Sequence, residues 1–230
     1  MLTAADIMTS AVVTVNPDTS IHEIAALLRE HHISGVPVVG EGDRVLGIVS
    51  EGDLIGHAKI AGEQRHSWWH GFFTNPTALA QHYAKSHGRT AGDVMTTDVV
   101  TVQEATSVAD TAHILARNGI RRVPVVRDGK LVGIVSRSNL IGVLATTDVS
   151  KPMSIADRTI RQQLSDELDA QPWAHLLAKN IVVENGVVHL FGLVQSEEER
   201  NAVRLAAKNV PGVRAVEDHL MVMSPDFYSF

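Results

Sequence analysis

The sequence predicts a mixed α/β (α+β) fold: two β-α-β-β-α units packed as a pair, followed by a small α-β-β-α-β domain. The first observation is a repeat. Asp6-Ile7-Met8-Thr9 returns as Asp93-Val94-Met95-Thr96, and Val13-Thr14-Val15 returns as Val100-Thr101-Val102, both with an offset of 87 residues. The second observation is a change of pattern after Val149. Duplicated units and a separate terminal domain account for both.

The repeat continues through the next strands of each copy. Ile33–Val39 (ISGVPVV) returns as Ile120–Val126 (IRRVPVV), and Gly47–Ser50 returns as Gly133–Ser136 with the offset reduced to 86. One extra residue therefore lies in the Gly-rich turn at 40–44. Because both flanks keep their register, we interpret the copies as duplicated structural units.

Each copy is expected to fold in the same order. An extended Val-Thr-Val leads to Thr19-Ser20 or Thr106-Ser107, whose hydroxyls are suited to capping a helix. A helix with a 3.6-residue apolar pattern follows. Two β-branched runs follow as a hairpin, and a second helix begins near Ser50 or Ser136. A unit of about 50 residues buries too little apolar surface to be stable alone, so the units should pack together. The apolar face of the first helix is predicted to comprise Ile21, Ile24, Ala25 and Leu28.

These motifs, ending in Val-Pro-Val-Val and Gly-Ile-Val-Ser, resemble the CBS domain, and the tandem resembles a CBS pair, or Bateman module. The resemblance covers residues 1–55 and 91–146. It implies a regulatory module that binds an adenosyl ligand (AMP, ADP, ATP, NAD or S-adenosylmethionine) in clefts between the units. It also implies a homodimer, with no required cofactor and adenine nucleotide as the regulatory ligand.

The polar end of each hairpin is the predicted ligand site. In the first copy, Ser50 begins a helix and Asp53 returns to its face three residues later, where a carboxylate could bind a ribose diol. The alternative is a capping box made by the same two residues. In the second copy, Ser136 and Asn139 take these places, and an amide lacks the charge-assisted strength of the carboxylate.

Three arginines distinguish the second copy. Arg137 replaces Glu51, and Arg121 and Arg122 replace Ser34 and Gly35. Since the guanidinium fork suits phosphate, we expect the second copy to hold the phosphates. The alternative is that these arginines are solvated or pair with acids of a dimer partner.

The opening strands and the Val-Pro steps complete the predicted nucleotide site. In the related family the opening strand lines the cleft, and the Val-Pro steps would give apolar walls for a base. Buried β-branched residues are, however, more often core than ligand contacts. The residues concerned are Thr14, Val15, Val36, Pro37, Thr101, Val102, Val123 and Pro124.

Residues 56–90 form an aromatic- and His-rich insertion, too long for a structureless connection, with a helix expected after Asn75-Pro76. His66 and His70 have the i, i+4 spacing of two metal ligands, but no third ligand is evident in the sequence. Surface histidines are the alternative, so no metal site is predicted.

After a linker at 147–153, residues 154–223 resemble a BON domain, and 224–230 form a tail. Asn185-Gly186 predicts a tight hairpin. Ser196 to Glu199 predicts the solvated start of a helix with Ala202, Leu205 and Ala206 inward. The BON resemblance implies contact with a phospholipid or membrane surface. From 151 to 230 there are eight Lys or Arg and eleven Asp or Glu, a net charge of −3, so lipid contact should be weak and a protein partner is equally expected.

The composition narrows the function classes. The chain has no cysteine and a formal net charge of −6, which excludes disulfides and thiol catalysis and argues against broad nucleic-acid binding. Neither a membrane-spanning run nor a signal peptide is present, which predicts a cytoplasmic location. With no phosphate loop, nucleophile elbow or HExxH motif, we expect no enzyme.

Two hypotheses remain from the sequence. In the first, the chain is a signal-transduction protein that senses an adenosyl ligand and relays occupancy to the BON domain or to an unknown protein partner. In the second, the CBS pair is a structural dimerisation platform, and the BON domain anchors it to a membrane surface or a protein.

Overall fold

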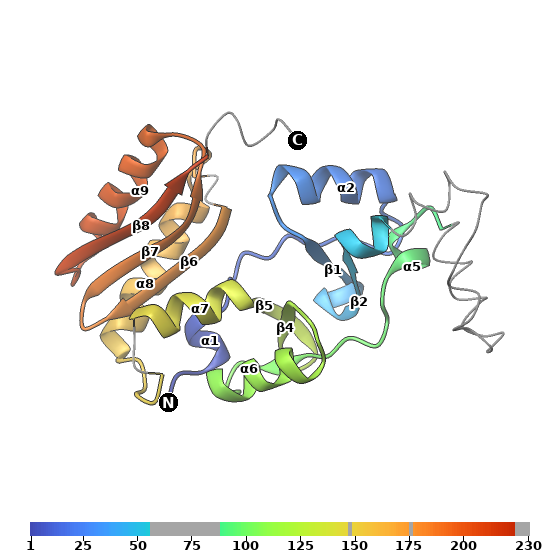
Figure 1. Cartoon of the computed structure of the whole chain (residues 1–230), viewed down its shortest axis with the longest axis horizontal. Coiled ribbons are helices and arrows are strands. Elements are labelled where there is room, and N and C mark those ends of the chain that lie inside the picture. Colours follow the sequence, from blue (N-terminus) through green and yellow to red (C-terminus); the bar gives the residue numbers. More distant parts are fainter. Residues whose placement is uncertain (56–87, 147–148, 175–176, 224–230) are drawn as a thin grey trace. The chain divides into compact units, whose positions relative to one another are not determined.

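The computed structural model describes residues 1–55, 88–146, 149–174 and 177–223. Most of the predicted insertion, with His66 and His70 in it, lies outside the described residues, as does the whole predicted tail. The rest forms three small sheets with helices packed on them, which confirms the mixed α+β prediction (Figure 1). These residues divide into two compact units.

One unit contains most of the first copy, from Val13 to Val100 where described. Its two strands are antiparallel, and Val15 adds a parallel bridge to Val38, as the predicted strand order requires. Ser20 caps the long helix by accepting a hydrogen bond from the Glu23 amide at 3.2 Å. The elements are α2 (Ile21–Glu30), β1 (Gly35–Val39), a 3-10 turn (Glu41–Asp43), β2 (Val45–Ser50) and α5 (Ala91–Val94).

The other unit contains Met1–Val12, the second copy from Thr101 onward apart from Gly129–Leu131, and the terminal domain. Its second copy repeats the plan of the first, with a three-stranded sheet in the order β3-β4-β5. The elements of this part are α1 (Ala4–Ile7), β3 (Val102–Gln103), α6 (Val108–Arg117), β4 (Arg122–Arg127), β5 (Lys130–Ser136) and α7 (Arg137–Thr146).

The opening segments of the two copies are exchanged. Thr9, after α1, pairs with Ile134 of β5, and Thr96, after α5, pairs with Ile48 of β2. Gly47 and Gly133 leave room for the methionine of the exchanged segment, because a Cβ at either glycine would overlap that side chain. The exchange was not predicted, since the repeat shows which motifs are equivalent but not which copy each one packs against.

The first long helix buries a narrower stripe than predicted. Ile24 and Leu28 are buried in the core with Val36 and Val49, and Ile21 is half-buried. Ala25 was predicted to face inward, but it is exposed. The i and i+4 positions, Ile24 and Leu28, therefore make the main contact of α2 with its sheet.

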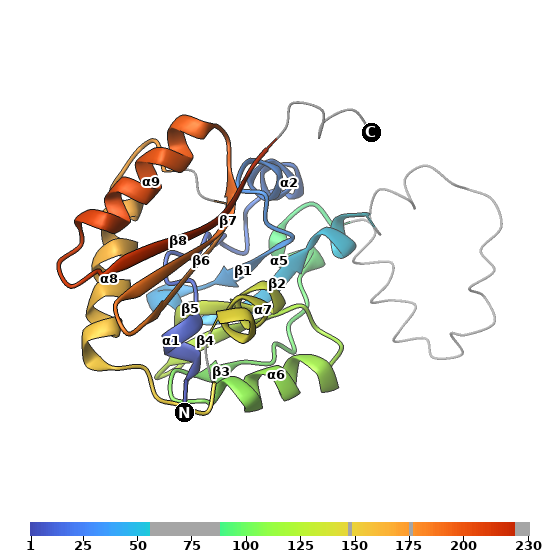
Figure 2. The same ribbon diagram turned by 60° about the vertical axis from the view of Figure 1, so that its left-hand side comes forward.

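The terminal domain has the predicted α-β-β-α-β order. Its sheet pairs β6 with β7 antiparallel and β7 with β8 parallel. Helices α8 and α9 cover one face, and α7 packs against β6 (Figures 1 and 2). Asn185 and Gly186 have φ of 52° and 78°, which confirms the tight hairpin. The elements are α8 (Ile155–Asp169), β6 (Leu177–Glu184), β7 (Val187–Val194), α9 (Glu197–Asn209) and β8 (Ala215–Val222).

The predicted inward face of α9 is confirmed only in part, since Ala206 packs partly buried against the core and Ala202 is half-buried. Val203 and Ala207 are fully buried, whereas Leu205 is 59% exposed. Glu199, expected in the solvated start, is 8% exposed, and its carboxylate accepts a hydrogen bond from the Gln195 amide at 2.7 Å. The 3.6-residue period fits both faces, and contact with the sheet selects the one that carries Val203.

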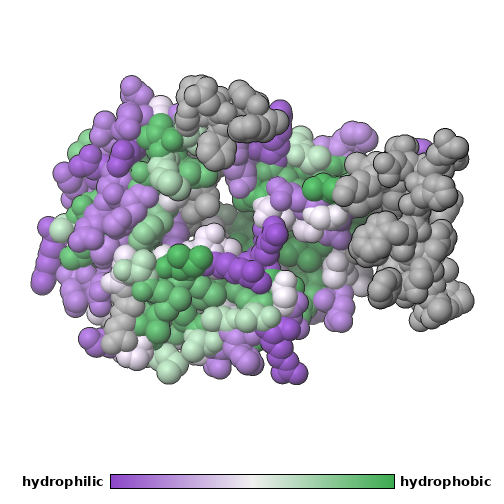
Figure 3. Space-filling view, viewed as in Figure 1, coloured by the Kyte–Doolittle hydropathy of each residue, from purple (hydrophilic) through white to green (hydrophobic). Residues whose placement is uncertain are grey.

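Helix α7 presents an apolar surface. Ile141 and Leu144 are 67% and 66% exposed, and Figure 3 shows hydrophobic residues gathered over this helix. Among the described residues, no helix has the length and apolarity needed to cross a bilayer.

Candidate functional site

The polar motif at the end of each hairpin adopts one geometry in both copies. The amide and hydroxyl of Ser50 donate to Oδ2 of Asp53 at 3.0 and 2.7 Å. The same groups of Ser136 donate to Oδ1 of Asn139 at 2.8 and 2.7 Å. These residues therefore cap the following helix, as the capping-box alternative predicted. A ligand role would be additional to this capping.

The two caps differ in what they can offer a ligand. A carboxylate has about four acceptor sites, whereas the amide oxygen of Asn139 has two and Ser136 uses both. The amide nitrogen of Asn139 can only donate. Asp53 is half-buried, and Asn139 is 4% exposed. The first copy is thus better suited to accept hydrogen bonds from a diol.

The arginines of the second copy lie beside its cap. The Arg137 amide donates to the Arg121 carbonyl at 3.0 Å, as Glu51 donates to Ser34 at 3.2 Å in the first copy. The Arg137 side chain also donates from Nε to the Ile120 carbonyl at 3.2 Å. Arg121 and Arg137 are exposed and Arg122 is half-buried at the start of β4. Exposed guanidinium groups on adjacent backbone can bind an anion.

The predicted apolar contacts lie mostly in the cores. Val36 and Val123 are 0% exposed, and Pro37 and Pro124 are buried beside them in β1 and β4. In the opening strands, the valines are buried and the threonines are exposed to solvent. The valines Val15 and Val102 are 5% and 3% exposed, while the threonines Thr14 and Thr101 are exposed.

The predicted residues therefore gather into two groups, each within one unit. The group of the first copy comprises Thr14, Val15, Val36, Pro37, Ser50 and Asp53. The group of the second copy comprises Thr101, Val102, Arg121, Arg122, Val123, Pro124, Ser136, Arg137 and Asn139.

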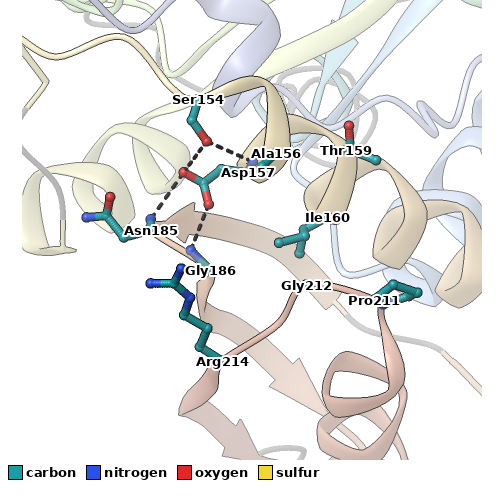
Figure 4. A pocket seen from close by; sticks show the side chains of 10 residues that line it. All are labelled: Ser154, Ala156, Asp157, Thr159, Ile160, Asn185, Gly186, Pro211, Gly212 and Arg214. Atoms are coloured by element: carbon teal, nitrogen blue, oxygen red, sulfur yellow. Dashed lines mark hydrogen bonds between the residues drawn. The ribbon is translucent and has the colours of Figure 1, made fainter.

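A separate hollow lies in the terminal domain, where α8 begins. It has a volume of about 420 Å³ and is lined by residues that include Ile160, Pro211 and Arg214 (Figure 4). Asp157 at its wall is already engaged, with Oδ2 accepting from the Ser154 hydroxyl at 2.7 Å and the Asn185 amide at 3.1 Å. Oδ1 accepts from the Gly186 amide at 2.8 Å. The buried carboxylate thus fixes the hairpin to the helix.

A half-buried arginine, Arg161, ties the opening segment of the chain to the terminal domain. Arg161 of α8 donates to the Ile181 carbonyl at 3.1 Å, the Ala5 carbonyl at 3.3 Å and the Met8 carbonyl. Burial lowers the pKa of Arg161 to about 10, which still leaves it charged at neutral pH. Sequence reasoning missed this residue, because its partners are far away along the chain.

A neighbouring ion pair supports the same contact. Arg158 donates from Nε to Oδ1 of Asp6 at 2.6 Å. Burial alone would raise the pKa of Asp6, but hydrogen bonds from Arg158 and Thr3 outweigh it and hold the pKa below its usual 3.8. The first Asp-x-Met-Thr motif therefore contacts the terminal domain directly.

Comparison with protein families matches residues 4–59 and 91–146 to the CBS domain, and residues 156–223 to the BON domain. The chain belongs to the CBS-domain family and carries a BON domain after its CBS pair. Both resemblances found in the sequence are confirmed.

Curated relatives match the CBS pair. CBS domain-containing protein CBSX1, chloroplastic, of Arabidopsis thaliana is 37% identical over 137 residues, which cover 55% of this CBS-BON chain and 56% of the relative. The chain thus spans little more than half of that protein. An uncharacterised 17.7 kDa protein of Acidianus ambivalens is 30% identical over 141 residues, or 61% of the chain and 71% of the relative.

A solved structure shares the fold of the CBS pair. CBSX2 of Arabidopsis thaliana in complex with AMP is 33% identical, with a TM-score of 0.55. The match covers 63% of the CBS-BON chain and 97% of that structure.

Proposed function

We propose that this chain is a non-enzymatic regulatory protein whose CBS pair binds an adenosyl ligand of the AMP class. The observation that carries the proposal is the similarity to CBSX2, a CBS pair whose structure holds AMP, across nearly the whole of that structure. The duplicated Ser-capped motifs support it, since each copy places a serine hydroxyl at the same position. The first copy adds the carboxylate of Asp53, and the second adds the guanidinium of Arg137.

The differences between the copies favour a model in which the first copy binds the ribose of the ligand and the second copy binds its phosphate. Asp53 would accept hydrogen bonds from the ribose hydroxyls, because it has more acceptor sites than Asn139. Arg121 and Arg137 would bind phosphate, because both are exposed cations on adjacent backbone. Thr14 and Thr101 would add hydroxyls, while the buried valines and prolines would shape the site rather than contact the ligand closely.

The terminal domain would receive the signal through the opening segment. Met8 and Thr9 contact the second copy, at Gly133 and Ile134 respectively. Ala5 and Met8 contact the BON helix α8, because their carbonyls accept hydrogen bonds from Arg161. A ligand that binds the two arrangements of this segment with different affinity would shift the BON domain between them. The readout is then contact with a protein partner or, more weakly, a phospholipid surface.

The proposal includes a homodimer. The exposed Ile141 and Leu144 of α7 support it, because isologous interfaces form between identical apolar surfaces of two copies. The cytoplasmic location expected from the sequence stays a prediction.

The decisive experiment is a thermal-shift panel of AMP, ADP, ATP, NAD and S-adenosylmethionine on the full chain. At 100 times its dissociation constant, a ligand should stabilise the fold by about 2.7 kcal/mol. The absence of a shift with every compound would refute the sensor and leave the structural adaptor.

Variants then test the division of the ligand. Arg137→Ala should weaken the binding of ATP more than the binding of adenosine. Arg117→Ala, at an exposed position of α6, should change neither affinity. Equal losses for ATP and adenosine in Arg137→Ala would contradict a phosphate contact.

A further inference from the structure

Three side chains that can bind metal meet on the face of the BON sheet opposite α8 and α9. His189 of β7 is in register with Glu217 of β8, and His219 follows two residues later on β8. Alternate residues of a strand point to the same face, so all three share one side. Their neighbours Val188, Leu190 and Leu220 point to the other side, into the helix-covered core.

The atoms that would bind an ion are already close together. Oε2 of Glu217 lies 3.1 Å from Nδ1 of His189 and 3.8 Å from Nε2 of His219. The three ligand atoms all lie within 4.8 Å of one another. In a tetrahedral zinc site with bonds of about 2.0–2.1 Å, ligand atoms are about 3.3 Å apart. The observed distances bracket this separation.

Nδ1 of His189 lies 3.1 Å from Oε2 of Glu217 but makes no hydrogen bond of ordinary geometry with it. His189 is 8% exposed, and its Nδ1 is buried without a hydrogen bond, although it faces the carboxylate of Glu217. A buried polar atom without a partner is rare and needs an explanation. A metal ion between the nitrogen and the carboxylate would provide one.

The surroundings leave a route for the ion. The side chains of Glu217 and His219 are 57% and 43% exposed, so solvent can supply the remaining ligand. Phe191 stacks on the His219 ring at 4.6 Å between centroids and positions it. The rings of His189 and His219 are parallel within 8°, so at least one must turn about χ2 for both lone pairs to meet one ion. That torsion is soft in histidine.

We propose that His189, Glu217 and His219 form a binding site for a divalent transition metal of the zinc class, with a water molecule as the fourth ligand. Two imidazoles and one carboxylate suit Zn²⁺, and the same set also binds Cu²⁺ and Ni²⁺. Calcium and magnesium prefer oxygen ligands and are disfavoured. The site is independent of nucleotide binding by the CBS pair.

The test is a Zn²⁺ titration by calorimetry of the full chain after treatment with EDTA, together with Co²⁺ absorption spectroscopy. We expect one Zn²⁺ site at these residues and the intense visible bands of tetrahedral Co²⁺. Glu217→Gln and His219→Ala should each weaken this site by more than about 100-fold, since loss of outer-shell partners alone costs 10- to 100-fold.

Controls separate this site from other histidines. His113→Ala changes an exposed histidine on α6 and should leave the affinity unchanged. Thermal unfolding of metal-free Glu217→Gln should match that of the metal-free wild type, because Glu217 is exposed. Absence of Zn²⁺ binding, or binding that survives equally in Glu217→Gln and His219→Ala, would overturn the proposal.

Discussion

Asp6 and Arg158 are 152 residues apart in the chain, yet Nε of Arg158 donates to Oδ1 of Asp6 at 2.6 Å. The carboxylate is 2% exposed, and the guanidinium 49%. Asp93, the counterpart of Asp6 in the second copy, instead accepts from the Arg89 amide at 2.8 Å and from Thr90. The same motif is thus a local cap in one copy and, in the other, also a contact with the BON domain.

The first prediction concerns Asp6 and pH. Its folded pKa lies below its usual 3.8, so its stabilisation is complete above about pH 4 and is lost as pH falls through the folded pKa. Asp6→Asn should reduce the free energy of unfolding at pH 7 by about 1.5–3 kcal/mol, the range for hydrogen bonds to charged groups. The free energy of unfolding of this variant should also decrease less than that of the wild type between pH 7 and pH 3. Urea unfolding at pH 7 and pH 3 measures both.

Asp18→Asn is the control for this experiment, because Asp18 is exposed and precedes α2. It should leave the wild-type pH dependence unchanged. An Asp6→Asn variant with wild-type pH dependence would show that the ion pair contributes nothing to acid stability.

The second prediction concerns Arg161. Arg161→Met should destabilise the chain by at least about 1–3 kcal/mol, the cost of leaving one buried acceptor without a donor. Since the lost contacts join α8 to α1, the BON domain should unfold separately from the CBS pair, giving two calorimetric transitions. Arg29→Met, at an exposed position of α2, should not change the number of transitions.

The third prediction concerns the exchanged opening segment. A Cβ at Gly133 would overlap Sδ of Met8 and lie 3.2 Å from its Cβ. Gly133→Ala should therefore cost about 1–3 kcal/mol, as overpacking does. Met8→Ala in the same chain should recover part of that loss in a double-mutant cycle by chemical unfolding. Purely additive effects would contradict the contact.

The fourth prediction concerns the ribose. Asp53→Asn should keep the helix cap, since Asn139 forms the same cap with Ser136 in the second copy. It should lower the affinity for adenosine and for AMP about 5- to 10-fold, because charged and neutral hydrogen bonds differ by about 1 kcal/mol. Calorimetric titration measures this. Unchanged affinity in a stably folded variant would restrict Asp53 to capping.

The fifth prediction concerns dimerisation. Leu144→Asp places a charge on the exposed apolar surface of α7 and should convert a dimer to a monomer in light scattering. Leu205→Asp, on the exposed face of α9, is the matched control, because Leu205 is 59% exposed. A wild-type chain that is already a monomer would contradict the homodimer. A dimer that persists in Leu144→Asp would show that its interface lies outside this surface of α7.

Local patterns were sufficient to predict the elements. Ser20 and Ser107 cap helices, as the Thr-Ser pairs predicted, because each cap depends on residues three positions apart. The Asn185-Gly186 hairpin followed from the tolerance of both residues for positive φ. Ala25 and Leu205 were misplaced because neighbouring helical stripes differ by one position, and only packing against the sheet selects between them.

Contacts between distant segments could not be predicted in this way. The alternation of Glu217 and His219 on one strand could have been noticed, but their meeting with His189 depends on the parallel register of β7 and β8. The contacts of Arg161 with Ala5 and Met8 depend on how the opening segment packs.

By itself, the sequence determined that a motif is duplicated, that each copy ends in a serine-capped helix, and that a smaller domain follows. These features follow from periodicity, turn residues and caps, which act over a few residues. Only the tertiary structure decided that the opening segments exchange, that Asp6 meets Arg158, and that His189 meets Glu217 and His219. Such contacts depend on burial and strand register between segments far apart in the chain, which no local spacing specifies.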